Sequence, residues 1–443
     1  MQSLPINTIP DLDNSAFKRV LESIEQTNDS FLLTGKAGTG KSTLLRHFCK
    51  TSLKKKVVLA PTGIAAINVG GQTVHSFFGF PFRPLVQGDE EIRKYPEYSE
   101  KYKIIRSMDT LIIDEISMLR ADLIDAIDHS LRINGGNAAL PFGGKQVVFI
   151  GDLFQLEPVV SNTDVEYMMF NQYYKSPYFF SANIFKELKL HCLELKKVYR
   201  QSDKNFISLL NKVRLNQADW DHIEELNARH NPAFSFSQSS YAITLCTRNQ
   251  VASNINDVQL EKITTPEYAF QGVITDNYNI KNLPTDHILI LKTGAQVMFI
   301  KNSITGKWVN GTIGHIHSLA PDKIEVKLTN GNIEEVTREE WENKTYVWER
   351  NSRTISSKIL GTFKQFPLKL AWAITIHKSQ GMTFDEVVID TAGGAFAHGQ
   401  MYVALSRCRT LEGITLTNKI TPRDIIVDER VVNFAHDQFI EIE

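Results

Sequence analysis

The sequence of 443 residues contains no apolar run that approaches the about 18 residues needed to span a membrane as a helix. Residues 1–15 lack the basic and then apolar stretches of a secretory leader, and their acidic side chains argue against a transit peptide. Repeats of long period and low-complexity tracts are also missing. We therefore expect a globular protein of about three structural units. We expect it in the cytosol, or in the nucleus if its source has one.

Cysteine is scarce, with only four residues that stand far apart in the sequence. No C-x-x-C pair and no cysteine–histidine pair with zinc spacing occurs, so we expect reduced thiols and no zinc site. His315 and His317 share one face of an expected strand, but a third ligand is missing. This favours a surface strand over a metal site.

An excess of charge of one sign is missing too, since 49 Lys and Arg face 50 Asp and Glu for a formal net charge of -1. This balance removes the simplest argument for a nucleic-acid partner, a basic chain attracted to phosphates. The charges are nevertheless uneven. Residues 186–214 hold eight basic against three acidic side chains, and residues 424–443 hold six acidic side chains against one basic. Such runs are usually solvated faces, so a nucleic-acid partner has to be argued from local motifs.

Short apolar runs alternate with amphipathic stretches from about residue 12 to 155. The runs lack polar alternation, as in parallel strands covered on both faces; they are FLLT (31–34), VVLA (57–60), TLIID (110–114) and QVVFIGD (146–152). Amphipathic residues 41–51 and 116–132 lie between them. Repeated units of this kind predict an α/β sheet, which the proline-containing residues 79–105 interrupt as an inserted element.

A second α/β series follows residue 190. Its expected strands are 190–195, 241–247, 385–390 and 411–417, and its expected helices are 203–214, 218–229 and 398–407. Residues 300–365 differ, because short alternating strands separated by turn signals predict a small antiparallel barrel inserted in this second unit. We predict a first α/β domain over 1–185 with a small insertion at about 63–105, a second over 186–299 and 366–435, and a tail over 436–443.

Residues 35–42, GKAGTGKS, fit the pattern G-x-x-x-x-G-K-S/T, directly after an expected strand and at the start of an expected helix. Glycines let backbone N–H groups wrap phosphate oxygens, and the helix N-terminus adds the positive end of its dipole. In such loops a lysine like Lys41 reaches the β- and γ-phosphates and a serine like Ser42 ligates Mg²⁺. The alternative, a glycine turn with a chance lysine, is disfavoured by the strand and helix around it. We predict a nucleoside triphosphate site formed by Gly38, Thr39, Gly40, Lys41, Ser42 and Thr43.

Asp114 and Glu115 end an apolar strand. The two acids of such a pair can have different roles: Asp114 can hold Mg²⁺, while Glu115 can orient and deprotonate the attacking water. Two acids at a strand end are often only a solvated loop start, but the phosphate-binding loop on the same predicted sheet favours the functional interpretation. Gln155 follows the next strand, in GDLFQLEPV, where an amide near the γ-phosphate can sense hydrolysis.

Phosphoryl transfer also needs positive charge from outside the phosphate-binding loop. Arg200 in VYRQ and Arg407 in VALSRCR are the candidates, both in the predicted second α/β unit. Each arginine alone is more often a surface or ion-pair residue. As a pair facing the loop, they would make the closure of two domains depend on ATP.

Eight motifs in order carry a family resemblance: GKAGTGKST, APTGIAA, GQTVHSFF, IIDEISM, GDLFQLEPV, VYRQ, AITIHKSQGMTFDEVVID and MYVALSRCR. Together they resemble superfamily-1 helicases of the B branch, which move 5′→3′ on DNA. Residues 121–132 and the following PFGGKQVVFIGD are similar to the signature of the petite-integration-frequency (Pif-type) helicases, which RecD-type relatives lack. The resemblance covers about residues 12–417. It implies two RecA-like domains in tandem and an SH3-like barrel at 300–365.

The resemblance also implies roles for individual residues. Those that contact or sense the γ-phosphate would be Gln155, Arg200, Gln380 and Arg407, with Gly381 beside them. Those that contact single-stranded DNA would be Thr62, Gly63, Thr73, His75, Phe77, His377 and Ser379. Family members usually carry a glutamine near residue 17 that reads adenine. Here Asn14 is followed by Phe17, which either stacks on a base or packs.

Aromatic residues cluster after His75, namely Phe77, Phe78, Phe80 and Phe82. Stacking on one base is worth roughly 1–3 kcal/mol and tolerates any sequence, which suits a translocating motor. The alternative is that the rings pack the loop; we prefer packing for three of them and DNA contact for Phe77. At the entrance of the expected barrel, Lys301, Asn302 and Asn310 either contact phosphates or are ordinary surface residues, and we keep Asn302 as a candidate.

We predict an ATP-driven 5′→3′ DNA helicase that uses Mg²⁺, tracks on single-stranded DNA and unwinds forked or tailed duplex DNA. The resemblance extends its substrates to G-quadruplexes and RNA–DNA hybrids. We expect a monomer, with dimerisation on DNA left open, and a loop near 153–164 as the wedge between the strands.

Two alternatives are a nucleic-acid-binding remodeller that does not unwind duplex and a P-loop kinase. The second acid and the two distant arginines argue against the kinase. Because such a motor must release DNA, the near-neutral net charge predicts a narrow DNA-binding track. It also predicts that the affinity for DNA depends only modestly on salt.

Overall fold

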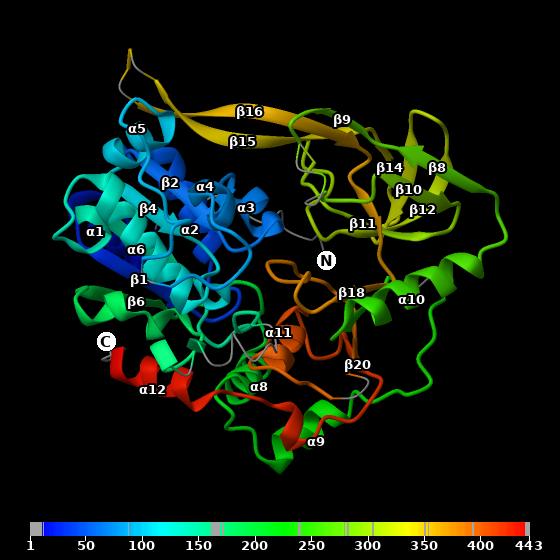
Figure 1. Cartoon of the computed structure of the whole chain (residues 1–443). Coiled ribbons are helices and arrows are strands. Elements are labelled where there is room, and N and C mark those ends of the chain that lie inside the picture. Colours follow the sequence, from blue (N-terminus) through cyan, green and yellow to red (C-terminus); the bar gives the residue numbers. More distant parts are fainter. Residues whose placement is uncertain are drawn as a thin grey trace. The chain divides into compact units, whose positions relative to one another are not determined.

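The computed structural model describes residues 11, 13–86, 88–160, 169–170, 172–237, 241–278, 280, 283–303, 305–349, 351–352, 354–391 and 394–438. The chain divides into two compact units. Unit 1 contains residues 1–199, 344–359 and 428–443, and unit 2 contains residues 200–343 and 360–427. Figure 1 gives the positions of the labelled elements within each unit. No helix among the described residues combines the length and apolar character needed to cross a bilayer.

A six-stranded parallel sheet in the order β3-β2-β4-β5-β1-β6 forms the centre of unit 1. Its strands are β1 (Ser30–Gly35), β2 (Lys56–Ala60), β3 (Gln72–Thr73), β4 (Thr110–Ile113), β5 (Gln146–Ile150) and β6 (Leu190–Leu195). The predicted strands that became β1, β2, β4 and β5 are confirmed, and their side chains are almost all buried. Because the strands are parallel, their carboxyl ends meet at one edge of the sheet, where α/β folds bind ligands.

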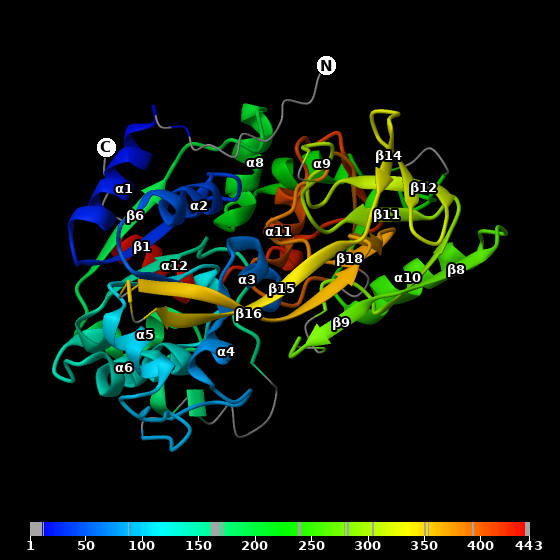
Figure 2. The same ribbon diagram turned by 90° about the horizontal axis from the view of Figure 1, so that it is seen from above.

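Helices cover both faces of this sheet (Figure 2). One face is covered by α1 (Ser15–Gln26) and α2 (Lys41–Thr51), whose apolar side chains form a core with Phe31, Leu33 and Val148. Neighbouring strand residues point to opposite faces. Phe149 accordingly contacts Phe142 and Phe179 on the other side, next to α6 (Ala121–Gly135) and α5 (Glu100–Ser107). Among the described residues, short 3₁₀ turns include η1 (Ile116–Met118), η2 (Pro141–Gly144), η3 (Phe179–Ser181), η4 (Asn183–Lys186) and η6 (Pro422–Asp424).

Strand β6 belongs to the first sheet, whereas the sequence assigned it to the second α/β unit. It pairs with β1 along its whole length, from Ser30 opposite Leu190 to Gly35 opposite Leu195. A Cβ atom at Gly35 would lie 2.5 Å from the carbonyl oxygen of Leu195, so glycine is required where this strand passes. An apolar strand does not encode which of two similar sheets it joins, and for that reason the expected border at residue 185 differs from the observed one at Tyr199.

Unit 2 contains a four-stranded parallel sheet in the order β18-β7-β19-β20. The strands are β7 (Ile243–Cys246), β18 (Ala373–Thr375), β19 (Val387–Asp390) and β20 (Ile414–Leu416). The helices of this unit are α8 (Lys204–Arg214), α9 (Trp220–Asn227), α10 (Asn249–Glu261) and α11 (Gln400–Ser406). These elements confirm the strands predicted at 241–247, 385–390 and 411–417 and the helices predicted at 203–214, 218–229 and 398–407.

The β-rich part of unit 2 begins earlier than the predicted residue 300. An antiparallel sheet of five strands contains β11 (Gln296–Phe299), β12 (Ile313–Leu319), β13 (Ile324–Leu328), β14 (Ile333–Val336) and β17 (Leu368–Leu370). A separate pair joins β8 (Glu267–Gln271) to β10 (Ile288–Lys292), and β9 (Val273–Asp276) pairs with β16 (Thr354–Gln365). One core of residues from Phe270 to Trp372 unites the first two groups. The strands predicted within 300–365 are confirmed, and the SH3-like arrangement stays a prediction.

The strands β15 (Glu339–Glu349) and β16 form a long two-stranded ribbon (Figure 1). Residues 344–359 at its tip belong to unit 1, although the sequence assigned them to the barrel. The hydroxyl of Tyr346 accepts a hydrogen bond from the Val58 N–H (3.0 Å) and lies 3.3 Å from the Val58 carbonyl oxygen. The side-chain amide of Gln72 donates to the carbonyl of Lys344. The tip therefore satisfies polar backbone groups of β2.

The last helix among the described residues is α12 (Glu429–Gln438), which was predicted in part as a tail. Phe434 of this helix stacks on Phe180, with ring centroids 4.4 Å apart and planes 9° apart. Both residues lie in unit 1. The tail residues 439–443 and the residues 161–164 of the predicted wedge loop lie outside the described part of the chain.

Candidate nucleotide and nucleic-acid site

The predicted phosphate-binding loop joins β1 to α2 at the carboxyl edge of the sheet. Gly38 and Gly40 have φ angles of 81° and 86°, in the left-handed region that glycine adopts without strain. The Lys41 ammonium donates hydrogen bonds to the carbonyl oxygens of Gly35 (2.5 Å) and Lys36 (3.0 Å), so it lies inside the loop. Ser42 and Thr43 follow in the first turn of α2, and Ser42 is exposed. The loop thus combines backbone N–H groups with a central cation, as phosphate binding requires.

Two aromatic rings pack against the phosphate-binding loop. A Cβ atom at Gly40 would lie 3.0 Å from Cζ of Phe17 and 3.8 Å from Cδ2 of Tyr199. Phe17 is only 2% exposed and belongs to the core under the sheet, which favours packing over base stacking for this residue. The Tyr199 N–H donates to the carbonyl of Gly38 (2.8 Å), and the Asn14 amide donates to the Tyr199 hydroxyl (3.0 Å). Asn14 is therefore held beside the loop by Tyr199, a residue of the VYRQ motif that sequence reasoning did not select.

The acidic pair follows β4. Asp114 is 6% exposed, and burial together with the neighbouring charge of Glu115 raises the pKa of its carboxyl group to about 7. Glu115 has φ 51° and ψ 47°, a left-handed conformation that is unusual for a residue with a side chain. Strained backbone of this kind gathers at functional sites, and here it turns the chain sharply between the strand and η1.

Gln155 follows β5, the strand between β4 and β1. It is 6% exposed, and its side-chain amide lies 3.4 Å from the carboxylate of Asp152. The same carboxylate accepts the N–H of Phe154 (3.2 Å), so Asp152 organises the turn that holds Gln155. Asp152 is fully buried, and only its position directly after an expected strand could have pointed to it.

Among the residues predicted to contact DNA, those of the APTG and GQTVHSF motifs follow β2 and β3 in unit 1. Thr62 accepts the N–H of Ala65 (3.3 Å) and so caps α3 (Gly63–Val69), while Thr73 accepts the N–H of Ser76 (3.2 Å) and caps α4 (Val74–Phe78). His75 is partly exposed in α4. In unit 1 the nucleotide motifs therefore occupy the ends of β1, β4 and β5, and the two DNA motifs of this unit occupy the ends of β2 and β3 of the same sheet.

Phe77 is fully buried in this structure. Its ring meets Phe78 and Tyr346 edge to face, at centroid distances of 4.8 and 5.9 Å. The Lys101 ammonium lies over its face, 4.0 Å from the centroid. These contacts favour the packing alternative for Phe77, and its predicted DNA contact stays a prediction.

The two predicted arginines meet at Ser406 in unit 2. Arg200 donates to the Ser406 carbonyl (3.1 Å), and Arg407 donates to the Ser406 hydroxyl (2.9 Å). Arg407 is 1% exposed; it also donates to the carbonyl of Val403 in the middle of α11. Gln201, a neighbour in the motif that sequence reasoning passed over, donates to the carbonyls of Ser406 (3.2 Å) and Cys408 (2.9 Å). The structure thus confirms that both arginines lie in one unit, and their contact with phosphate stays a prediction.

The HKSQG residues follow β18 in the same unit. Ser379 is fully buried and its hydroxyl donates to the carbonyl of Ile376 (2.7 Å), while Arg407 lies 3.4 Å from the Ser379 carbonyl. Burial lowers the pKa of His377, and Gly381 has a φ angle of 77°. Gln380 is partly exposed in this turn. Asn302, which is exposed in unit 2, accepts the N–H of Asn310 (2.7 Å) and so closes a turn.

Comparisons with known proteins agree with this arrangement. The family model described as PIF1-like helicase matches residues 9–222, and the model for a UvrD-like helicase C-terminal domain matches residues 370–412. The ATP-dependent DNA helicase Pif1 of Bdellovibrio bacteriovorus is 31% identical over 92% of this chain and 88% of its own length. The chain belongs to the PIF1-like helicase family.

Other family members differ in length. The ATP-dependent DNA helicase PIF1 of Danio rerio is 34% identical over 90% of this chain, but the chain spans only 60% of that protein's length. A crystal structure of Bacteroides sp Pif1 in complex with ADP-AlF4 superposes with a TM-score of 0.88 at 39% identity and covers 96% of both chains. Bacteroides Pif1 bound to single-stranded DNA is also similar, with a TM-score of 0.68, 39% identity and 96% coverage of both chains.

The acidic pair of this PIF1-like chain yields a stability prediction. An acid whose pKa is higher in the folded than in the unfolded state holds its proton more tightly when folded. Stability therefore falls as the pH rises from about 4, the ordinary Asp value, to about 7, and the loss is complete at higher pH. Asp114→Asn keeps the shape without the charge, so we expect a melting temperature several degrees higher at pH 8 and unchanged at pH 4.

Calorimetry with a chelator present measures this effect. Asp13→Asn is the matched control, because Asp13 is exposed near the start of α1 and its replacement should not shift the melting temperature. An Asp114→Asn protein that melts at or below the wild-type temperature at pH 8 would contradict the burial argument.

Proposed function

We propose that this chain is an ATP-dependent DNA helicase that moves 5′→3′ on single-stranded DNA and unwinds duplex DNA. One observation carries the proposal. The phosphate-binding loop, the acidic pair and the motifs that follow β2 and β3 all lie at the same edge of one sheet. ATP hydrolysis and the affinity for single-stranded DNA would then change together, because both depend on loops at the ends of neighbouring β-strands. Family membership supports the same function.

The nucleotide would be bound by the loop around Lys41 and hydrolysed with Glu115 as the base. A carboxylate and a hydroxyl are the protein ligands that Mg²⁺ takes beside phosphate oxygens and water. Asp114 and Ser42 supply this pair, and the raised pKa of Asp114 indicates a buried acid that a bound cation would stabilise in its charged form. Mg²⁺ would neutralise charge on the transferred phosphoryl group. Gln155, Arg200, Gln380 and Arg407 remain our candidates for γ-phosphate contacts.

The DNA partner would be a single strand with an adjoining duplex, fork or tail. Bacteroides Pif1 has been solved bound to single-stranded DNA. A further similar structure describes DNA unwinding at forked duplex DNA by two coordinating Pif1 helicases. Because of this similarity, we propose that the chain also binds single strands and forks. It would be a monomer in solution, and two copies would act together at a fork. G-quadruplexes and RNA–DNA hybrids are further substrates to test. All four cysteines are free thiols, and on this basis we propose a reducing compartment such as the cytosol, or the nucleus if the source has one.

Phosphate release measured with and without an oligothymidylate tests the proposal. We expect hydrolysis of ATP that single-stranded DNA stimulates strongly. An equal rate with and without DNA would contradict DNA-coupled hydrolysis. Transfer of phosphate to an acceptor with no free phosphate released would instead identify a kinase.

A further inference from the structure

The four phenylalanines after the DNA motif divide into a buried set and one exposed ring. Phe77, Phe78 and Phe80 are at most 4% exposed and contact one another, so packing accounts for them. Phe82 is 90% exposed. The prediction that Phe82 packs is therefore wrong, because the irregular spacing of the four rings does not distinguish a buried ring from an exposed one.

Phe82 is nevertheless held in a defined orientation. Its ring lies parallel to the imidazole of His75, with centroids 4.6 Å apart and planes 16° apart. Burial, and after it the charge of Arg120, lowers the pKa of His75 below its ordinary value near 6.5, so the imidazole is neutral at pH 7. The neutral imidazole thus lies alongside Phe82, and the exposure of 90% leaves most of the phenyl ring open to solvent.

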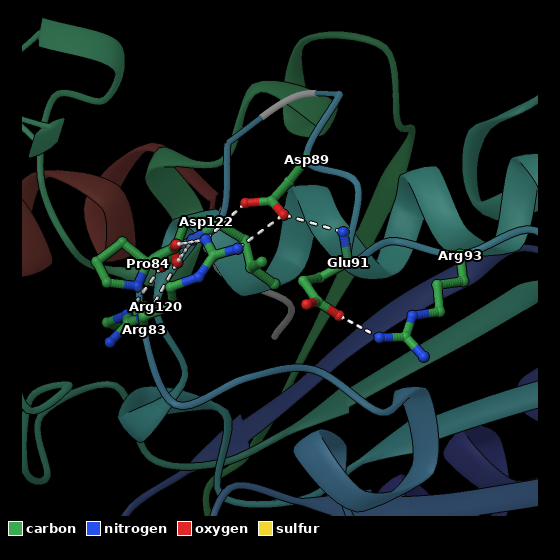
Figure 3. A network of polar contacts seen from close by, with 8 residues as sticks. Arg83, Pro84, Asp89, Glu91, Arg93, Arg120 and Asp122 are labelled. Atoms are coloured by element: carbon green, nitrogen blue, oxygen red, sulfur yellow. Dashed lines mark hydrogen bonds and ion pairs between the residues drawn. The ribbon is translucent and has the colours of Figure 1, made fainter.

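The loop that carries Phe82 is fixed by ion pairs on its C-terminal side (Figure 3). Arg83 binds both carboxylate oxygens of Asp89, at 2.7 and 3.0 Å, and also donates to the carbonyl of Pro84. The Leu85 N–H donates to the buried carboxylate of Asp122 (2.9 Å), which is itself held by Arg120 at 2.9 Å to each oxygen. Such preorganisation reduces the entropy that a ligand would have to remove on binding.

We propose that Phe82, stacked on His75, is a platform on which one base of single-stranded DNA stacks. The inference rests on the proposed function and adds a contact to it. The shared chemistry is aromatic stacking, which accepts any base. His75 belongs to the motif at the end of β3, so the platform continues the predicted DNA track. A single flat ring has the size of a base, whereas a docking site for a protein needs an apolar patch of several hundred Å².

Binding of the whole chain to a labelled oligothymidylate, followed by fluorescence anisotropy, tests the platform. Phe82→Ala should raise the Kd roughly fivefold to a hundredfold, the range measured for loss of one stacked base. Phe82→Trp should retain wild-type affinity, because indole offers an equal or larger stacking face. Tyr98→Ala is the matched control: Tyr98 is an aromatic residue of the same insertion and 80% exposed, and its loss should leave the Kd unchanged.

A scan of the oligonucleotide with single abasic sites identifies the stacked base. In the wild type one abasic position should weaken binding, and in Phe82→Ala the same position should cost nothing further, because the two changes remove one contact. Equal Kd values for wild type and Phe82→Ala would overturn the platform, as would independent effects of the two changes. Failure of the wild type itself to bind the oligonucleotide would refute the proposed function instead.

Discussion

Glu115→Gln should lower the turnover of ATP by about 10²–10⁴, the usual contribution of a positioned general base. The amide has the shape of the carboxylate but cannot accept the proton of the attacking water. ATP binding should survive, because Lys41 and the glycines of the phosphate-binding loop are untouched. The left-handed backbone at Glu115 also remains the same, since the exchange alters only the end of the side chain.

The turnover is measured as phosphate release under saturating ATP and DNA. Nucleotide binding is measured separately by equilibrium titration. Glu22→Gln on the exposed side of α1 is the matched control and should hydrolyse ATP at the wild-type rate. Turnover within a few-fold of wild type in Glu115→Gln would remove Glu115 from the role of base. Loss of nucleotide binding in this variant would show that it acts on the loop rather than on the water.

Lys41→Ala should reduce hydrolysis by at least about a hundredfold, the cost of removing one preorganised group that stabilises transition-state charge. The Lys41 ammonium lies between two loop carbonyls and is the cation nearest to the place where phosphates bind in such loops. DNA binding should persist, because Thr62, Thr73 and His75 lie at the ends of other strands.

Parallel assays of ATP hydrolysis and oligothymidylate binding separate these effects. Lys50→Ala, an exposed lysine in the last turn of the same helix, is the control for loss of one positive charge. A Lys41→Ala protein that loses both activities and also melts early would indicate misfolding. Hydrolysis preserved in a folded Lys41→Ala protein would contradict the phosphate site.

Local patterns were sufficient to predict most of the α/β architecture. Buried parallel strands such as β4 consist of uninterrupted apolar residues, and the phosphate-binding loop has a sequence that follows from its glycine conformations. Long-range pairing was harder to predict. Strand β6 joined the first sheet, and the tip of the β15–β16 ribbon joined unit 1 through Tyr346. The few residues that form each of these contacts do not show which sheet or unit they will join.

The candidate site shows the same division. The positions of Lys41, Asp114 and Gln155 beyond strand ends could be predicted because each follows a recognisable apolar strand, whereas their roles stay predictions. Residues that act through others, such as Asp152 and Ser406, could not be selected, because a buried hydrogen bond leaves no spacing signal. Phe77 and Phe82 illustrate the limit most directly: the two rings are five positions apart in one loop-rich segment, and only the packing around them distinguishes the buried ring from the exposed one.

Strand displacement with defined tails tests the central claim most directly. The whole chain is given ATP and Mg²⁺ with a duplex that carries a 5′ single-stranded tail, and in parallel with the same duplex carrying a 3′ tail. We expect separation of the 5′-tailed duplex and little separation of the 3′-tailed one. DNA-stimulated ATP hydrolysis without displacement of either duplex would contradict it and favour a remodeller that binds single strands, and preferential displacement of the 3′-tailed duplex would contradict the proposed direction.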